Sequence, residues 1–134
     1  MMKKIEKINQ LIEQNSKYFE NKKVLITGAN SGIGFAFTKL LANIKGIHIT
    51  LCCRNSLRAN KAMDELLKIN ENLSVDIFLA DLSNINSVLN LKDYFLNNKY
   101  DYIYLNAGVL SSNYNEDNIS ITYLTNLLSN AYLS

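Results

Sequence analysis

The sequence contains no proline and only two cysteines among its 134 residues. Because proline is absent, no expected helix or strand is interrupted by a residue that lacks a backbone N–H. Cys52 and Cys53 are adjacent in an expected strand, where neighbouring side chains point to opposite faces and do not readily bridge. We therefore expect two reduced packing residues of an intracellular protein, with no metal site and no redox role.

Long apolar runs and a strong net charge are also missing. No run approaches the roughly 18 apolar residues needed to cross a bilayer. Residues 1–23 carry three glutamates and no continuous apolar stretch, so neither a secretory nor a mitochondrial presequence is supported. The net charge of +2 favours neither nucleic acid nor an acidic membrane as a partner. The length and the 48% content of hydrophobic residues are typical of one soluble globular domain.

The chain alternates between two kinds of apolar pattern. Short apolar runs, expected to be strands, occupy residues 23–27, 47–52, 75–80 and 101–106. Between them, apolar residues recur at helical spacing. The three stripes consist of Ile33, Ala36, Phe37, Leu40, Leu41 and Ile44, then Ala59, Ala62, Met63, Leu66 and Leu67, then Ile85, Val88, Leu89 and Phe95. This alternation predicts an α/β fold, in which helices cover both faces of a parallel sheet.

Residues suited to helix capping precede two of these stripes. Asn55 or Ser56 is expected to cap the second helix, and Ser83 the third. Residues 1–22 are expected to form an extra amphipathic helical extension, whose apolar face consists of Ile5, Ile8, Ile12 and Phe19. We interpret it as a packing helix, and a helix that binds a membrane surface or a partner is the alternative.

Three of the five glycines lie within seven residues, at the first strand-to-helix turn. Such a turn directs the N–H groups and the dipole of the following helix towards an anion. We expect Gly28 to allow the sharp exit from the strand, Gly32 to let a pyrophosphate approach the backbone, and Gly34 to let the helix pack closely. The spacing is neither the dinucleotide fingerprint G-x-G-x-x-G nor a P-loop. A turn that binds no ligand is the alternative.

The charge near the end of the second strand favours NADP(H) over NAD(H). NAD-selective folds place an acidic residue about 20 residues beyond the glycines, where it binds the ribose 2′-hydroxyl. Here Arg54 stands 20 residues after Gly34, and no Asp or Glu lies between Ile47 and Ala62. A guanidinium can hold a 2′-phosphate, which a carboxylate would repel. Arg58 is a possible second contact, although a solvated surface arginine is the preferred interpretation.

Three motifs together carry a resemblance to a known family. The octapeptide TGANSGIG (27–34), the tripeptide DLS (81–83) and the tripeptide NAG (106–108) follow successive strands. In this order they resemble the short-chain dehydrogenase/reductase family, over residues 23–109. The resemblance implies an NADP(H)-dependent oxidoreductase with a Rossmann-like sheet in the order 3-2-1-4. The segments CCRN and YIYLNAG are similar to the ketosteroid reductase branch of the family, with retinol dehydrogenase-like members as the alternative.

The resemblance also implies roles in holding the cofactor. Asp81 would bind the adenine amino group and the backbone of Leu82 would contact the ring, although a helix-capping Asp81 is the alternative. Asn106, Ala107 and Gly108 would line the ribose, with Asn106 tied to the turn near Thr27; the alternative is a buried asparagine that satisfies only backbone groups. Backbone amides around three residues of the glycine turn should face the phosphates, and these residues are Asn30, Ser31 and Ile33.

The family's catalytic groups do not follow the fourth strand. By resemblance they are a serine, a Tyr-x-x-x-Lys pair and an asparagine that holds a water chain. The one Tyr-x-x-x-Lys match, Tyr18 to Lys22, precedes the glycine turn and is not expected to be catalytic. Residues 110–134 are expected to form a polar loop and a short helix, in which Thr125 and Asn126 are only faintly similar to the family's asparagine helix.

The sequence therefore predicts the N-terminal half of a reductase, with no catalytic residues of its own and an open sheet edge suited to self-association. By the same resemblance, its full-length form would reduce a ketosteroid or similar lipophilic carbonyl compound, in the cytoplasm or at the endoplasmic reticulum membrane. A non-catalytic NADP(H)-binding or interaction module is the competing hypothesis. The chain alone is expected to bind NADPH without turnover.

Overall fold

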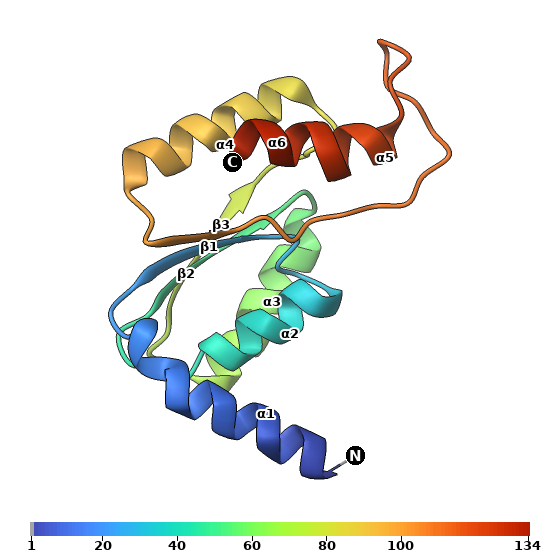
Figure 1. Cartoon of the computed structure of the whole chain (residues 1–134). Helices are drawn as coiled ribbons and strands as arrows, with labels where there is room; N and C mark the ends of the chain where they lie inside the picture. Colours follow the sequence, from blue (N-terminus) through green and yellow to red (C-terminus); the bar gives the residue numbers. More distant parts are fainter. Residues whose placement is uncertain (1) are drawn as a thin grey trace.

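A parallel four-stranded sheet forms the centre of the computed structural model, which describes residues 2–134 (Figure 1). The strands are β1 (Lys23–Thr27), β2 (His48–Cys53), β3 (Ser74–Leu79) and β4 (Tyr102–Tyr104). Their order is β3-β2-β1-β4, and every pairing is parallel. The predicted α/β class and strand order are confirmed. The bounds of β2 and β3 differ from the prediction by one residue at each end, and β4 is shorter than predicted.

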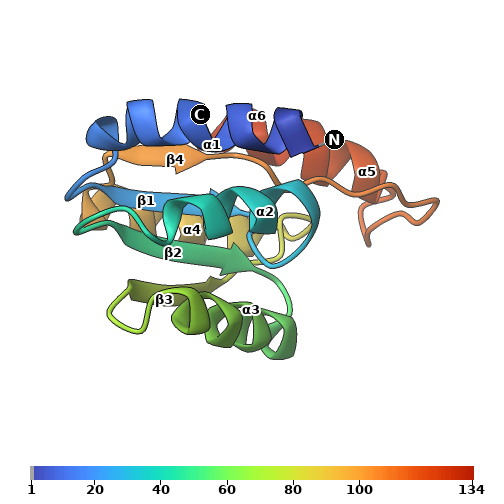
Figure 2. The same ribbon diagram turned by 90° about the horizontal axis from the view of Figure 1, so that it is seen from below.

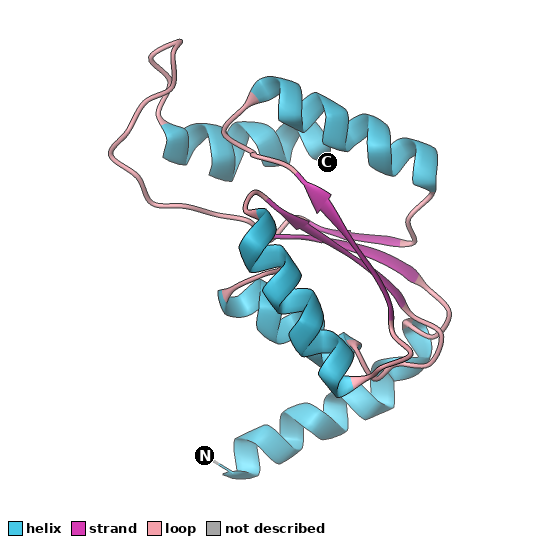
Figure 3. Ribbon diagram, turned by 180° about the vertical axis from the view of Figure 1, so that it is seen from behind, coloured by secondary structure: helices cyan, strands magenta, loops and turns pink. Residues whose placement is uncertain are grey.

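Helices cover both faces of this sheet (Figures 1 and 2). On one face lie α2 (Gly32–Leu41) and α3 (Ser56–Ile69). On the other face lies α4 (Ile85–Asn98), and beside it the C-terminal helical segment, residues 121–133. This segment consists of α5 (Ile121–Tyr123), the π-helical turn η2 (Leu124–Leu128) and α6 (Ser129–Leu133). The sheet thus lies between two helical layers (Figure 3).

Strand alternation divides the apolar core into two parts. Ile26, Ile49 and Leu51 pack towards α2 and α3, whereas Leu25 packs towards α4. The two cysteines follow the same alternation, because Cys53 belongs to the first part and Cys52 to the second. Both are buried and neither forms a disulfide, as the sequence predicts.

Raising the pH is expected to destabilise the fold through these two thiols. Burial raises the pKa of Cys52 from 9.0 to about 12 and that of Cys53 from 9.0 to about 11. A raised pKa means that their contribution to stability is complete below the unfolded value of 9.0 and is lost as the pH rises through 11 and 12. Each thiol then lowers the free energy of unfolding by up to about 1.4 kcal/mol per pH unit.

Urea unfolding measured at several alkaline pH values tests this expectation. The double variant Cys52→Ala/Cys53→Ala serves as the comparison, because its other titrating groups are unchanged. Its free energy of unfolding should fall less steeply with pH than that of the original chain. Parallel slopes for the two proteins would contradict the prediction.

The predicted apolar stripe of α2 holds only in part, because Leu41 and Ile44 are buried and Phe37 packs against the core, but its other members are exposed. The buried residues of α2 are Gly34, Thr38 and Leu41, whereas Ile33 is 83% exposed and Leu40 is 39% exposed. The physical reason is the close approach of Gly34 to the preceding turn. That contact turns the face at positions 34, 38 and 41 towards the sheet and leaves Ile33 pointing away.

The stripe of α3 was predicted correctly, since Ala59, Ala62 and Leu66 are buried. In α4, however, only part of the prediction holds. The buried residues are Val88, Leu91 and Phe95, while two predicted members, Ile85 and Leu89, are exposed.

One of the two predicted helix caps is also wrong. The side chain of Asn55 accepts a hydrogen bond from the Arg58 N–H at 2.9 Å, so Asn55 caps α3 as predicted. The cap of α4 is Asn84, whose side chain accepts from the Ser87 N–H, and not Ser83. Ser83 instead donates its N–H and its hydroxyl to the Asp81 carboxylate.

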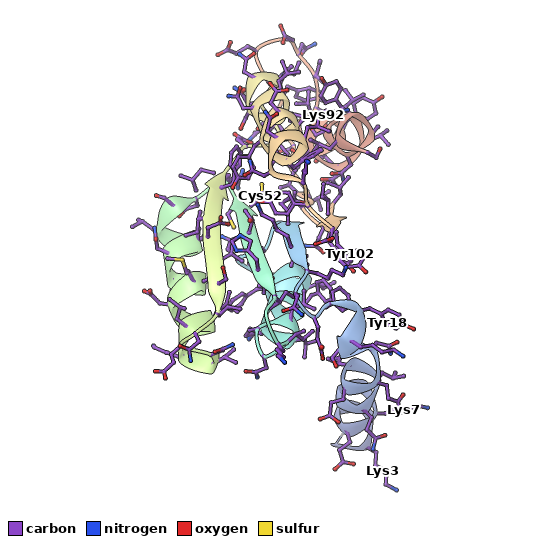
Figure 4. All side chains as sticks on the ribbon, turned by 90° about the vertical axis from the view of Figure 1, so that its left-hand side faces the viewer. Lys3, Lys7, Tyr18, Cys52, Lys92 and Tyr102 are labelled. Carbon is purple, nitrogen blue, oxygen red and sulfur yellow. The ribbon has the colours of Figure 1, made fainter. Side chains whose placement is uncertain are left out.

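The N-terminal extension contains α1 (Met2–Asn15) and the short 3₁₀ helix η1 (Ser16–Tyr18), and α1 projects away from the sheet (Figure 4). The Tyr102 hydroxyl donates to the Tyr18 carbonyl at 3.1 Å, and the rings of Phe19 and Tyr102 lie 5.2 Å apart. The side chains of Ile5 and Ile8 lie outside the described part of the structure. Among the described helices, none has the length and apolar character needed to cross a bilayer.

Candidate cofactor site

The glycine turn between β1 and α2 adopts a backbone that its glycines make possible. Gly28 and Gly32 have φ values of +66° and +55°, in the left-handed region that favours glycine. A Cβ atom at Gly34 would lie 2.3 Å from the Gly28 carbonyl oxygen. At Gly32, in contrast, a Cβ would meet no atom within 4 Å. Gly34 therefore packs tightly against the Gly28 backbone, whereas the space beside Gly32 is open.

This turn forms one wall of a cavity of about 590 Å³ at the carboxyl ends of the strands. The other walls follow β2, β3 and β4, because parallel strands bring these three strand ends to one edge of the sheet. Every residue predicted to bind the cofactor lines the cavity except Gly34. These residues are Gly28, Asn30, Ser31, Gly32, Ile33, Arg54, Asp81, Leu82, Asn106, Ala107 and Gly108.

Positive charge enters the cavity from the end of β2. Arg54 and Arg58 both line it, and Arg58 is also exposed, as expected of a surface arginine. The ion pairs found in residues 2–134 join Lys22 to Asp101 and His48 to Asp76, so neither arginine is paired with an acidic residue. Both guanidinium groups are therefore available to an anionic ligand.

Asp81 is held by hydrogen bonds to two nearby serines, Ser83 and Ser87. Its Oδ1 atom accepts hydrogen bonds from the Ser83 N–H at 2.9 Å and from the Ser83 hydroxyl at 2.6 Å. Its N–H donates to the Ser87 hydroxyl at 2.8 Å. Within residues 2–134 no hydrogen bond engages the second carboxylate oxygen, Oδ2, which leaves it free to accept one from a ligand. Local structural support and ligand binding by Asp81 are thus compatible.

The segment after β4 is fastened to the glycine turn. The Asn106 side-chain amide donates to the Thr27 carbonyl at 3.3 Å, as expected from the sequence. The Ala107 N–H donates to the Thr27 hydroxyl at 3.0 Å, a contact that was not predicted. Thr27 is almost fully buried, so it joins the ends of β1 and β4 rigidly.

The sequence did not predict a role at the site for Thr125 or Asn126. Thr125 is buried and lines the cavity. The Asn126 side chain accepts from the Val109 N–H and donates to the Val109 carbonyl, each at 2.8 Å. Both residues lie on the π-helical turn η2, a feature that often marks functional sites. The available signal was the pair Thr125-Asn126 itself, which the flanking sequence made hard to recognise.

A model of the short chain dehydrogenase family matches residues 22–134, which include every wall of the cavity. The chain belongs to this family.

Two family relatives illustrate the extent of the similarity. The chain is 43% identical over 94 residues to the 3-keto-steroid reductase/17-beta-hydroxysteroid dehydrogenase 7 of Rattus norvegicus, covering 66% of this chain and 28% of the relative. It is 34% identical over 116 residues to the WW domain-containing oxidoreductase of Gallus gallus, covering 84% of this chain and 28% of that protein. The chain thus spans little more than a quarter of the length of these relatives.

Solved structures of the short chain dehydrogenase family share the fold. The short-chain dehydrogenase from Sphingobium yanoikuyae in complex with NADPH superposes with a TM-score of 0.72 at 23% identity, covering 84% of this chain and 45% of that one. The alcohol dehydrogenase from Thermococcus sibiricus complexed with 5-hydroxy-NADP gives a TM-score of 0.65 at 28% identity, covering 81% and 48%. Family members of this fold have therefore been crystallised with NADP-type cofactors.

The one Tyr-x-x-x-Lys match lies far from the cavity. Tyr18 and Lys22 precede β1, at the amino end of the strand, whereas the cavity begins at its last residue, Thr27. Lys22 pairs instead with Asp101 at 3.9 Å. In residues 2–134 no group of three His, Cys, Asp or Glu side chains is arranged to hold a metal ion.

Proposed function

We propose that this chain binds NADP(H) in the cavity at the carboxyl ends of its strands. The observation that carries the proposal is that three features line this one cavity. They are the glycine turn, Arg54 without an acidic partner in residues 2–134, and Asp81, of which only Oδ1 accepts hydrogen bonds from the described residues. The open space at Gly32 suits a pyrophosphate, because no side chain separates it from the backbone. Each feature fits a different part of one dinucleotide.

The proposed placement follows the cavity from one wall to the next. The backbone amides around Asn30, Ser31 and Ile33 would hold the phosphates, and Arg54 the 2′-phosphate. Asp81 would accept a hydrogen bond from the adenine amino group, with the backbone of Leu82 against the ring. Asn106, Ala107 and Gly108 would line the ribose.

In the full-length form, we propose, the bound cofactor supplies hydride to a ketosteroid or similar lipophilic carbonyl compound. The support is the 43% identity to a 3-keto-steroid reductase, and the reaction would take place in the cytoplasm or at the endoplasmic reticulum membrane. This chain would contribute the cofactor cavity. Neither Tyr18 nor Lys22 is positioned to move a proton in it. The 134 residues alone would then bind cofactor without turnover.

Titration of the purified chain with NADPH and with NADH, followed by the fluorescence of the reduced nicotinamide, tests the proposal. We expect a Kd for NADPH of about micromolar or weaker, and weaker binding of NADH. No binding of either cofactor at millimolar concentration would contradict the proposed function. Carbonyl reduction by the purified chain would contradict only the absence of turnover.

The sheet edge favours a second candidate function, a non-catalytic NADP(H)-binding and interaction module. Within the described residues β4 pairs only with β1, so no strand lies along its other edge. Such an edge can pair with another chain. Sedimentation velocity of the chain with NADPH present would distinguish a monomer from a self-associated form, and a monomer at all concentrations would count against self-association.

A further inference from the structure

One hydroxyl group of the C-terminal helical segment reaches across to a wall of the cavity. Ser129 is buried, and its Oγ atom donates to the carbonyl oxygen of Leu82 at 2.5 Å. Leu82 is itself buried and lies in the connection between β3 and α4, beside Asp81. Residues 47 positions apart in the chain are thus joined at the wall proposed to face adenine.

This hydrogen bond differs from the usual one of a helical serine or threonine. Such a hydroxyl commonly donates to the carbonyl four residues earlier in its own helix. Thr38 in α2 does so, donating to the Gly34 carbonyl at 2.7 Å. The hydroxyl of Ser129 is directed outside its helix, and it is the only hydrogen-bond partner of the Leu82 carbonyl within residues 2–134. A buried carbonyl without a partner would be unfavourable, so the contact fixes Leu82.

The C-terminal helical segment is anchored to the rest of the fold on either side of Ser129. Asn126, about one turn before Ser129, holds both backbone groups of Val109. Leu133, one turn after it, is buried in the core between the segment and α4. Lys92 of α4 donates to the Tyr132 carbonyl at 2.6 Å, where Figure 4 shows Lys92 beside the segment. The helix therefore holds the Leu82 wall from a fixed position.

We propose that Ser129 is a positioning residue for the adenine half of the dinucleotide. Its hydroxyl holds the Leu82 carbonyl, and Ser83 and Ser87 hold Asp81 from the other side. Together they fix the wall formed by Asp81 and Leu82 before a ligand arrives. This inference rests on the proposed function, because it assumes that the cavity receives NADP(H).

The test uses two ligands that occupy different walls. The first, 2′,5′-ADP, contains adenine and the 2′-phosphate, whereas pyrophosphate would engage only the glycine turn. In the variant Ser129→Ala we expect the Kd for 2′,5′-ADP to rise about three- to tenfold, the effect of one lost neutral hydrogen bond. The Kd for pyrophosphate, measured by NMR chemical-shift titration, should stay unchanged.

Two further variants complete the comparison. Ser134→Ala is the matched control, because the Ser134 hydroxyl bonds only the Ala131 carbonyl of the same helix end, away from the cavity. Ser129→Thr retains the hydroxyl and should restore most of the affinity for 2′,5′-ADP. Ser129→Cys keeps the side-chain shape with a weaker donor. It should weaken 2′,5′-ADP binding selectively, and it replaces the alanine variant if that protein does not fold.

Three results would overturn the inference. Equal weakening of both ligands would indicate general damage to the fold, and unchanged binding of both would mean that Ser129 does not position the wall. If the original chain binds neither NADPH nor 2′,5′-ADP, the proposed function fails and this inference fails with it. If the original chain binds 2′,5′-ADP and only the predicted selectivity is missing, the inference alone is wrong.

Discussion

Gly34→Ala is expected to lower the free energy of unfolding by about 3 kcal/mol or more, the upper part of the range for overpacked sites. The new Cβ would lie 2.3 Å from the Gly28 carbonyl oxygen and 2.4 Å from the Asn106 side-chain nitrogen. The first of these atoms belongs to the backbone of a turn whose φ is already left-handed, so it cannot move aside easily. Relief of the clash requires α2 to separate from the sheet. Urea unfolding followed by circular dichroism measures the change.

Gly32→Ala is the matched control for the same turn. Its Cβ would meet no atom within 4 Å, so the expected cost is the left-handed strain alone, about 1 kcal/mol. The same Cβ would stand between the backbone and a pyrophosphate, and NADPH binding should weaken at least about tenfold, as for other lost charge-assisted contacts. Gly34 is thus a folding residue and Gly32 a ligand residue. Equal destabilisation by both substitutions would contradict this division of roles.

The strands of the sheet could be predicted from the sequence because a continuous apolar run directly indicates a buried strand. The strands β1 (Lys23–Thr27) and β2 (His48–Cys53) are buried on both faces, and such strands appear as continuous apolar runs. Helix orientation was harder to predict. Ile33 and Leu40 follow helical spacing, yet the contact between Gly34 and the glycine turn decides which face of α2 meets the sheet. The spacing of apolar residues gives no information about that contact.

The residues of the candidate site likewise fall into those that the sequence predicts and those that it does not. Residues such as Arg54 and Asp81 could be predicted because they follow strands, and the ends of parallel strands meet at one edge. Asn126 and Ser129 could not be found by this argument. They reach Val109 and Leu82 only because α4 and the C-terminal helical segment pack side by side, and the sequence does not specify that packing. Arg58, in the first turn of α3, was considered from the sequence as a second contact, and it does line the cavity.

Arg54→Ala is expected to weaken NADPH binding about ten- to a hundredfold, while NADH binding stays nearly unchanged. The range corresponds to loss of a hydrogen-bonded charge contact of about 1.5–3 kcal/mol. Only NADPH carries the 2′-phosphate, and no Asp or Glu between Ile47 and Ala62 could take part in binding an NADH ribose there. Parallel fluorescence titrations with the two cofactors give the ratio directly. Higher ionic strength should reduce the preference of the original chain for NADPH, because salt screens an exposed charge.

Arg58→Ala provides the comparison that separates a specific contact from general charge. Arg58 also lines the cavity, and its N–H is already engaged by the capping Asn55, which places it at the start of α3. If the 2′-phosphate is held chiefly by Arg54, removing Arg58 should weaken NADPH binding by less than about fivefold, the range of an exposed ion pair. Equal losses in the two variants would mean that the cavity recognises the phosphate by its overall positive potential. A cofactor preference unchanged in Arg54→Ala would exclude Arg54 from that role.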